Sequence, residues 1–261
     1  MDQFESRRVA VITGAGSGIG AATAQRFAAD GYIVALVGRT PEALQNTIKE
    51  CPEDADVYAW AADVSDMAAI TAVIDDVAER FGSVDVLVNN AGFAIPGAVD
   101  QVDPESYQAM MRTNVDGVFF ASRAALPHLR VVHGCIVNVG AVSALGGDWG
   151  QAAYNMTKGA VKNLTDVMAL DHGHEIRVNA VHPGVTLTKQ YYRDALAEGT
   201  PLRKRFVDRV PMGRPAEPEE VAAVIAFLAG PDASYLNGVH IPVDGGLTAS
   251  NGQINLYRSD N

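Results

Sequence analysis

A tyrosine and a lysine, Tyr154 and Lys158, stand four residues apart in a stretch with helical periodicity. Residues at this interval share one face of a helix, so the phenol and the amine would lie side by side. A phenol in water has a pKa of about 10, and a neighbouring cation favours its ionised form. From the spacing alone, a solvated helix face is the favoured interpretation. The alternative is general acid/base chemistry at a substrate oxygen, with Lys158 lowering the pKa of the Tyr154 hydroxyl.

A glycine-rich segment follows the first expected strand and leads directly into an amphipathic helix. It reads Thr13-Gly14-Ala15-Gly16-Ser17-Gly18-Ile19-Gly20. Gly14 permits a tight turn, Gly18 lets the backbone approach a pyrophosphate, and Gly20 lets helix and strand pack closely. The amino end of the helix would then point at the anion. The segment predicts a dinucleotide site, against the alternative of a purely structural turn.

Short apolar runs alternate with longer segments of helical period along the chain, which is typical of a parallel sheet with crossover helices. The runs lack polar alternation, as expected for strands covered on both faces. Expected strands are 9–13, 33–38, 57–61, 84–89, 135–139, 177–181 and 240–243, and expected helices are 18–30, 41–50, 66–81, 104–129, 151–172 and 218–228. We predict one domain over residues 1–261, a doubly wound (Rossmann) α/β fold with a seven-stranded parallel sheet and helices on both faces.

The composition favours a small-molecule partner over a nucleic acid or a membrane. The 261 residues are 48% hydrophobic and carry a formal charge of -11, which repels phosphate backbones and anionic lipids. The two cysteines, Cys51 and Cys135, lack the spacing of a metal site, and we expect no metal. The polar start precedes an apolar run too short for a signal peptide, and no run is long enough to span a bilayer. We therefore predict a cytoplasmic protein.

Further landmarks follow one another in a fixed order along almost the whole chain. They are Asp63-Val64, Asn89-Asn90-Ala91-Gly92, Asn114, the pair Tyr154 and Lys158, Pro183-Gly184 with Thr188, and Val243-Asp244-Gly245-Gly246. Together with the glycine segment, they resemble the shorter, single-domain branch of the short-chain dehydrogenase/reductase family, with T-G-x-x-x-G-x-G and Y-x-x-x-K. The resemblance implies an NAD(P)-dependent short-chain alcohol dehydrogenase or ketoreductase, which transfers a hydride between nicotinamide and a secondary alcohol or ketone.

The resemblance also implies roles for single residues. Tyr154 would be the general acid/base, Lys158 would also hold the nicotinamide ribose, and Asn114 would order a proton-relay water. For Asn114 the alternative is a helix irregularity or a cap. The implied cofactor contacts come from Gly14, Ser17, Gly18, Ile19, Gly20, Gly38, Arg39, Thr40, Asp63, Val64, Asn90, Ala91, Gly92, Tyr154, Lys158, Pro183, Gly184, Thr186 and Thr188.

The end of the expected strand 33–38 bears on the choice of cofactor. A carboxylate there would bind the ribose 2′-hydroxyl and repel a 2′-phosphate, but this chain has Gly38 followed by Arg39. A guanidinium can pair with two phosphate oxygens, and the absent side chain at Gly38 would leave room for them. We expect NADP(H) to be preferred. NAD(H) stays the alternative, because Ser17 and not a second basic residue stands in the glycine segment.

The catalytic set has one gap, at Ala141. The family carries a serine thirteen residues before the tyrosine, whose hydroxyl holds the substrate oxygen, and this chain has Ala141 there. In an extended segment Ser143 would face the same side, about 6 to 7 Å further along and beyond hydrogen-bond reach. Loss of one such donor costs on the order of a hundred- to thousandfold in rate. Three explanations stay open: an engineered serine-to-alanine change, which we favour, a natural enzyme using Ser143 or water, or a cofactor-binding protein without chemistry.

The substrate pocket is expected at the strand ends and should be mostly apolar, which favours a hydrophobic or alicyclic secondary alcohol or its ketone. An insertion at about 186–210 resembles the mobile substrate lid of the family. We interpret its cationic residues as a solvated face, with an anionic substrate as the alternative. The tail, 251–261, is expected to cap a neighbouring pocket. Candidate substrate contacts are Phe93, Ser143, Leu145, Trp149, Val185 and Tyr191.

The principal rival function is a non-catalytic NADP(H)-binding sensor that controls a protein partner. An isomerase or dehydratase is disfavoured by the glycine spacing, and an enoyl reductase by the short interval between tyrosine and lysine. The resemblance further implies a homotetramer, which the family commonly forms through its long fourth and fifth helices.

Overall fold

Seven parallel strands form one sheet in the order β3-β2-β1-β4-β5-β6-β7. The computed structural model describes residues 7–188 and 190–253, without the side chains of residues 190 and 191. The strands are β1 (Val9–Thr13), β2 (Ile33–Gly38), β3 (Val57–Ala61), β4 (Val86–Asn89), β5 (Cys135–Val139), β6 (Arg177–Pro183) and β7 (His240–Val243). The strand order reverses beside β1, as in doubly wound folds, so the predicted Rossmann class is confirmed.

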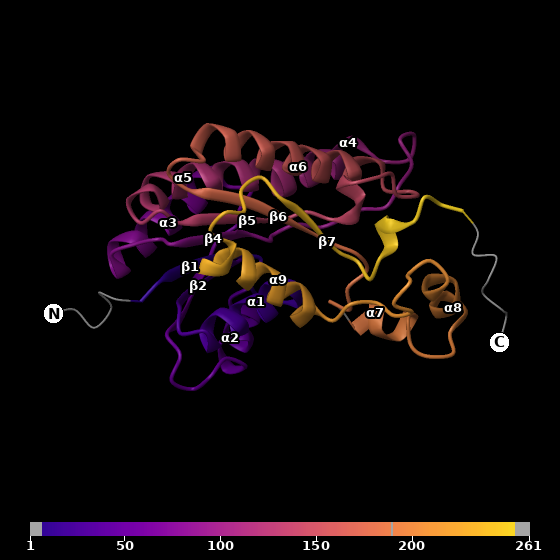
Figure 1. Ribbon diagram of the computed structural model, residues 1–261, viewed down its shortest axis with the longest axis horizontal. Coiled ribbons are helices and arrows are strands. Elements are labelled where there is room, and N and C mark those ends of the chain that lie inside the picture. Colours follow the sequence, from indigo (N-terminus) through magenta and orange to yellow (C-terminus); the bar gives the residue numbers. More distant parts are fainter. Residues whose placement is uncertain (1–6, 189, 254–261) are drawn as a thin grey trace.

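Helices cover both faces of the sheet (Figure 1). One layer holds α3 (Met67–Phe81), α4 (Pro104–Met111), α5 (Gly117–Val131) and α6 (Ala152–His172). The opposite layer holds α1 (Gly18–Ala29), α2 (Pro41–Lys49) and α9 (Pro218–Ala229). Two short helices, α7 (Gln190–Ala195) and α8 (Pro201–Val207), lie beyond one end of the sheet, on the side of α9.

Alternate residues of the buried strands point into two apolar cores. In β1, Val9 and Val11 pack on the side of α3 and α5, whereas Ala10 and Ile12 pack on the side of α1 and α9. All five residues of β1 are buried, whereas β7 at the sheet edge is only partly covered. The unbroken apolar runs therefore reflect two-sided burial, as the sequence predicts.

Local signals place most helix boundaries correctly. The carboxylate of Asp66 accepts hydrogen bonds from the amides of Ala68 and Ala69 and so caps the amino-terminal end of α3. The carboxylate of Asp103 accepts a bond from the amide of Ser106 in the same way, at the start of α4. Each bond satisfies an amide that the helix itself leaves without an acceptor.

Three predicted elements differ from the structure. The strand expected at 84–89 begins two residues later, at Val86, and the strand expected at 177–181 continues to Pro183. The helix expected at 104–129 is interrupted by a π-helical turn, Arg112–Asp116. The insertion at 186–210 contains α7 and α8, which the sequence did not predict. The π turn is a single local turn between two α-helical segments, and the sequence pattern over 104–129 did not predict it.

Among the described residues, no helix combines the length and apolar character needed to cross a membrane. Within the same residues, no group of three or more histidine, cysteine, aspartate or glutamate side chains is arranged to hold a metal ion. Most of the expected tail, residues 254–261, lies outside the described part of the chain.

Candidate active site

The glycine loop between β1 and α1 is packed so closely that Gly14, Gly18 and Gly20 have no room for side chains. A Cβ atom at Gly20 would lie 2.3 Å from the carbonyl oxygen of Gly14, which itself has a φ of +66°. The side chain of Ser17, at the N-cap of α1, makes no capping hydrogen bond. The first amides of α1 therefore keep their donors for an anion, as a pyrophosphate site requires.

Two polar side chains join this loop to the end of β4. The Thr13 hydroxyl accepts hydrogen bonds from the amides of Asn90 and Ala91, at 3.0 and 3.1 Å. The amide group of Asn90 donates to the carbonyl oxygens of Thr13 and Gly14, at 2.9 and 3.2 Å. Thr13 was not among the predicted site residues, although its place as the last residue of β1 was a usable signal.

The residues expected around the adenosine half lie at the ends of β2 and β3. Arg39 is exposed, and its guanidinium lies 3.8 Å from the Asp63 carboxylate, which also accepts bonds from the amide and hydroxyl of Ser65. A Cβ atom at Gly38 would meet the Leu44 side chain at 3.1 Å. The expectation that Gly38 leaves open room for a phosphate is therefore wrong, because Leu44 fills that space.

The loop after β6 crosses over the glycine loop. A Cβ atom at Gly18 would lie 2.8 Å from Cβ of Thr188, so Thr188 stands directly against the loop. The Thr186 hydroxyl donates to the Gly184 carbonyl oxygen, and Gly184 packs against Asp244. Of the other predicted contacts, Ile19 packs against the core beside α1, Ala91 and the buried Val64 join the opposite core, Thr40 is the N-cap of α2, and Pro183 ends β6.

A hollow of about 180 Å³ opens beside this crossing, and Gly18, Thr188 and Arg193 are among its lining residues. The close packing at the loop glycines, the uncapped amides at the start of α1 and this hollow together fit a dinucleotide at the carboxyl edge of the sheet.

Asn114, Gly92 and Lys158 converge beside the end of β4. A Cβ atom at Gly92 would lie 3.2 Å from Oδ1 of Asn114 and 3.6 Å from Nζ of Lys158. The buried Asn114 amide group donates to the Phe93 carbonyl oxygen and the Thr157 hydroxyl, and its Oδ1 accepts from the Phe93 amide. Asn114 lies within the π-helical turn, so the helix irregularity considered from the sequence occurs at this residue. Such turns are frequent at functional sites.

Lys158 is buried on α6 and directs its amine at the end of β5. Its Nζ donates to the Val139 carbonyl oxygen at 2.8 Å and lies 5.7 Å from the centre of the Tyr154 ring. Burial lowers the pKa of Lys158 to about 8. The two side chains are therefore neighbours, as their spacing predicts, but the amine is hydrogen-bonded to the backbone.

The Tyr154 hydroxyl stays protonated at neutral pH in this structure. Burial, followed by the nearby Tyr192 and Asp148, raises the pKa of Tyr154 to about 12. The expectation that Lys158 lowers this pKa is not met by the chain alone, because burial of the phenol dominates. Neither Asp148 nor Tyr192 was identified from the sequence as a neighbour of Tyr154. A protonated phenol in this position is a proton donor.

Position 141 offers no hydroxyl. Ala141 is buried and extended, but Val142–Ala144 form a short 3₁₀ helix, so the extended segment expected between Ala141 and Ser143 is wrong. The buried Ser143 donates its hydroxyl to the Asp148 carboxylate at 3.4 Å. Ser143 therefore has an acceptor of its own and does not simply replace the absent hydroxyl.

The predicted substrate contacts do not close into one cavity. Leu145 and Val185 are partly exposed, and Trp149 is 92% exposed, so the Trp149 side chain stands in solvent. The Phe93 backbone is fixed by Asn114. The side chain of Tyr191 and the whole of Lys189 lie outside the described residues.

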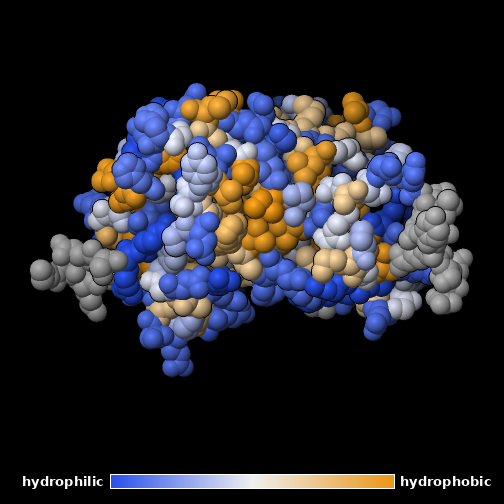
Figure 2. All heavy atoms as spheres, viewed as in Figure 1, coloured by the Kyte–Doolittle hydropathy of each residue, from blue (hydrophilic) through white to orange (hydrophobic). Residues whose placement is uncertain are grey.

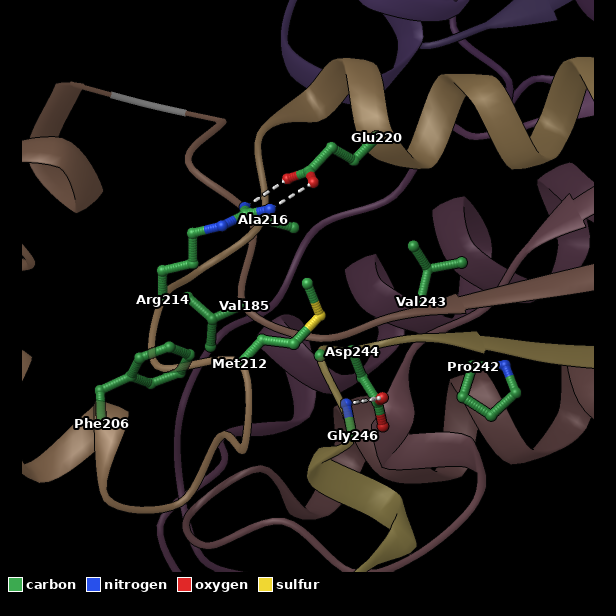
Figure 3. A pocket seen from close by; sticks show the side chains of 11 residues that line it. Val185, Phe206, Met212, Arg214, Ala216, Glu220, Pro242, Val243, Asp244 and Gly246 are labelled. Atoms are coloured by element: carbon green, nitrogen blue, oxygen red, sulfur yellow. Dashed lines mark hydrogen bonds and ion pairs between the residues drawn. The ribbon is translucent and has the colours of Figure 1, made fainter.

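A larger hollow of about 290 Å³ lies between α8 and the end of β7 (Figure 3). Its apolar wall includes Val185, Phe206 and Met212, and Val185 is the only predicted contact among the lining residues. On another wall the guanidinium of Arg214 makes two hydrogen bonds of 2.7 Å to the carboxylate of Glu220. The Asp244 carboxylate also lines the hollow and accepts bonds from the amides of Gly246 and Thr248, so the hollow combines an apolar wall with one ion pair and one carboxylate.

Comparison with known families and proteins gives matches over nearly the whole chain. A family model described as enoyl-(acyl carrier protein) reductase matches residues 14–248. A meso-2,3-butanediol dehydrogenase from Serratia marcescens is 48% identical over 249 residues, covering 94% of this chain and 96% of that protein. A trans-4-hydroxycyclohexanecarboxylate dehydrogenase from Sinomonas cyclohexanicum is 35% identical over 94% of this chain and 95% of that protein. An NADP-dependent (R)-specific alcohol dehydrogenase from Lentilactobacillus kefiri is 33% identical over 93% and 97%.

Solved structures agree with these matches. A double mutant of a short-chain dehydrogenase/reductase from Serratia marcescens superposes with a TM-score of 0.86 at 32% identity, covering 92% of this chain and 98% of that one. A 3-ketoacyl-(acyl-carrier-protein) reductase from Brucella melitensis, complexed with NADH, gives a TM-score of 0.83 at 35% identity over the same shares.

Proposed function

The chain belongs to the short-chain dehydrogenase/reductase family, and from this premise we propose that it interconverts a secondary alcohol and its ketone with a nicotinamide cofactor. The observation that carries the proposal is the convergence of Gly92, Asn114 and Lys158 beside Tyr154. When bound, the nicotinamide would supply or accept the hydride at the substrate carbon.

Each residue of the proposed site has one task. Tyr154 gives a proton to the carbonyl oxygen in reduction and takes it back in oxidation, and its raised pKa favours the donor role. Lys158 holds the Val139 carbonyl oxygen and faces the proposed ribose position, while Asn114 fixes the backbone of Phe93. The amides at the start of α1 bind the pyrophosphate. Residues 186–210, with α7 and α8, form a lid over the site.

We propose a hydrophobic or alicyclic substrate. Val185, Phe206 and Met212 give the hollow under α8 an apolar wall, and the Arg214 guanidinium there is neutralised by Glu220. Relatives whose names specify butanediol and hydroxycyclohexanecarboxylate as substrates agree with small secondary alcohols. An enoyl reductase activity is not proposed, because Tyr154 and Lys158 stand only four residues apart.

We propose that NADP(H) is preferred over NAD(H). The support is the exposed guanidinium of Arg39, directly after β2, where the sequence has no acidic residue; the Asp63 carboxylate at the end of β3 lies 3.8 Å from it. Relatives differ in this respect, since one is named NADP-dependent and another structure holds NADH. Arg39→Ala should weaken NADPH binding about tenfold and leave NADH binding unchanged. Equal affinities of the unchanged chain for the two cofactors would contradict the preference.

Two exposed apolar surfaces support a homotetramer. Figure 2 shows hydrophobic residues gathered along the upper rim, where α6 lies in Figure 1, and in the middle of the face. On α6, Met156, Val167 and Leu170 are exposed, and next to the α9–β7 edge Phe227 and Tyr235 are exposed. Two separate surfaces can build an assembly of four copies with closed symmetry. Light scattering that gives a monomer mass would contradict the tetramer.

The cytoplasmic location stays a prediction.

The test of the function is an absorbance assay at the reduced-nicotinamide band. The chain is mixed with NADPH or NADH and a panel of vicinal diketones, cyclic ketones and linear ketones, and with the oxidised cofactors and the matching alcohols. Oxidation of NADPH by at least one apolar ketone is expected. Tight cofactor binding without turnover, both in this chain and in its Ala141→Ser variant, would favour the non-catalytic sensor instead.

A further inference from the structure

A chain of hydrogen bonds runs from the surface of α6 to the backbone at position 141. Nδ1 of His182, on β6, lies 3.0 Å from the Ala141 carbonyl oxygen, and Nε2 of the same ring lies 2.9 Å from Nδ1 of His240. Nε2 of His240, on β7, lies 2.7 Å from Oδ1 of Asp166 on α6. Oδ2 of Asp166 accepts a bond from Lys162 at 3.1 Å. His182 is fully buried. This series of hydrogen bonds connects β7, at the edge of the sheet, with the segment after β5 that contains Ala141.

The positions of the protons in this series of hydrogen bonds follow from the groups at its two ends, a carbonyl oxygen and a carboxylate. A carbonyl oxygen only accepts, so Nδ1 of His182 carries a proton. Burial lowers the pKa of His182 to about 4, so its Nε2 is bare and accepts from Nδ1 of His240. Bonds from Lys162 and His240 lower the pKa of Asp166 although burial opposes this, so the carboxylate is ionised and Nε2 of His240 donates to it. With His182 neutral, all three bonds are satisfied only when His240 carries protons on both nitrogens.

The packing ties His182 to the same backbone segment. A Cβ atom at Gly140 would lie 2.4 Å from Nδ1 of His182 and 2.6 Å from its Cε1. The His182 ring therefore fills the space that a side chain at Gly140 would occupy. Lys158 holds the Val139 carbonyl oxygen and His182 holds that of Ala141, so two titratable groups fix successive parts of one strand end.

We propose that His182 and His240 are positioning residues, in which a His240 imidazolium bridges Asp166 and His182 and thereby fixes the backbone of position 141 against the substrate. This inference rests on the proposed function for its kinetic consequences only. The groups that face His240 are Asp166 and Lys162 of α6 and His182 of β6, and Lys158 acts on His182 from α6.

The proposal makes the geometry of position 141 depend on the charge of Asp166. The charged acceptor for Nε2 of His240 is the Asp166 carboxylate, 2.7 Å away. Without that charge the bridge from Asp166 to His182 weakens, and His182 is no longer held in one orientation. Removal of the Asp166 charge should therefore lower turnover.

The proton positions can be read directly by long-range ¹H–¹⁵N NMR of the full chain labelled with ¹⁵N-histidine. The two signals are assigned with His240→Gln and His182→Asn. At pH 7 we expect His240 with both nitrogens protonated and His182 neutral with its proton on Nδ1. A neutral His240, or a His182 proton on Nε2, would overturn the proposal. This measurement needs no activity, so its result is independent of whether the chain is an oxidoreductase.

The kinetic test uses Asp166→Asn with Asp75→Asn as a matched control. Asp75 makes the same kind of contact, 3.0 Å from Nε2 of His128, on the surface between α3 and α5. Asp166→Asn should lower kcat about tenfold with KM within about twofold. Asp75→Asn should change neither, and Asp166→Glu should restore most of kcat.

A double-mutant comparison separates positioning from simple stability. If the chain of bonds fixes position 141, the rate gain from Ala141→Ser should be smaller in the Asp166→Asn background than in the unchanged chain. Equal gains in the two backgrounds would overturn the positioning role. Absence of hydride transfer in every variant, with the expected histidine protonation, would contradict the proposed function and leave the His240 bridge intact.

Discussion

The loops after β1 and after β5 both turn at the carboxyl edge of the sheet, but different forces hold them. The glycine loop is fixed by packing, with would-be Cβ atoms at Gly20 and Gly18 within 2.8 Å of neighbouring atoms. The segment 139–141 is fixed by hydrogen bonds from two buried titratable groups, Lys158 and His182. One loop therefore excludes added atoms, and the other depends on protons.

This difference means that cofactor binding, by the glycine loop, and substrate positioning, by segment 139–141, depend on pH in different ways. A packed loop binds the same anion over a wide pH range, because no group in it titrates. A loop held by an amine and an imidazole keeps its geometry only in the matching protonation states. The two regions should therefore respond independently to substitution and to pH.

The largest effect should come from Tyr154→Phe, which removes only the proton donor. We expect kcat to fall about a thousandfold, since general acid catalysis contributes on that order. Cofactor affinity, measured by calorimetry, should be unchanged because the glycine loop is untouched. A variant that retains more than a tenth of the activity would place the proton donor elsewhere.

Gly20→Ala tests the packed loop in the opposite way. The added methyl would lie 2.3 Å from the Gly14 carbonyl oxygen, so the loop must shift. Cofactor affinity should fall about a hundredfold, by analogy with small displacements of binding groups. Gly159→Ala is the control, because nothing lies within 4 Å of its added methyl. If Gly20→Ala binds cofactor normally, packing does not fix the loop.

Ala141→Ser tests the other loop by supplying the absent hydroxyl. Turnover should rise at least tenfold, and at most by the hundred- to thousandfold that one donor is worth. Cofactor affinity should stay the same. Ser143→Ala should have little effect on turnover if Ser143 mainly serves Asp148. An unchanged rate in Ala141→Ser would remove the explanation based on a missing donor.

The smallest expected effect is a change in melting temperature, in the variant Lys158→Met. Burial lowers the pKa of Lys158 from 10.5 to about 8, so the unfolded chain binds more protons between these values. This group therefore lowers stability fully below pH 8, and the penalty is relieved as pH rises to 10.5. The variant should lose activity but melt about 5 °C higher at pH 7, with a smaller gain at pH 9.5. A lower melting temperature at pH 7 would mean that the bond to Val139 outweighs the burial penalty.

Sequence patterns predicted the elements whose bounds depend on residues that are close together in the sequence. Strands β1, β2, β3, β5 and β7 have the predicted bounds, because apolar runs between turn residues specify them directly. The glycine loop and the spacing of Tyr154 and Lys158 likewise depend on neighbours in sequence. Their protonation does not, because the pKa of Tyr154 is set by burial and by Tyr192, from another element.

Contacts between distant parts of the chain could not be predicted in this way. His182 and His240 are 58 residues apart, and His240 and Asp166 are 74 apart, so only the sheet topology brings them together. Nothing in the sequence around His182 distinguishes it from an ordinary buried histidine. The space beside Gly38 was also misjudged, because Leu44 reaches it from α2.

The most direct test of hydride transfer is mass spectrometry of the product after incubation of a ketone with cofactor deuterated at nicotinamide C4. The reduced cofactor is prepared as each of its two C4-deuterated stereoisomers, and each is tested separately. Only one of the two should give an alcohol that carries one deuterium. Slow turnover does not obscure this result, because product accumulates. Failure of both stereoisomers to give deuterated alcohol, with this chain and with Ala141→Ser, would contradict an oxidoreductase built on Tyr154.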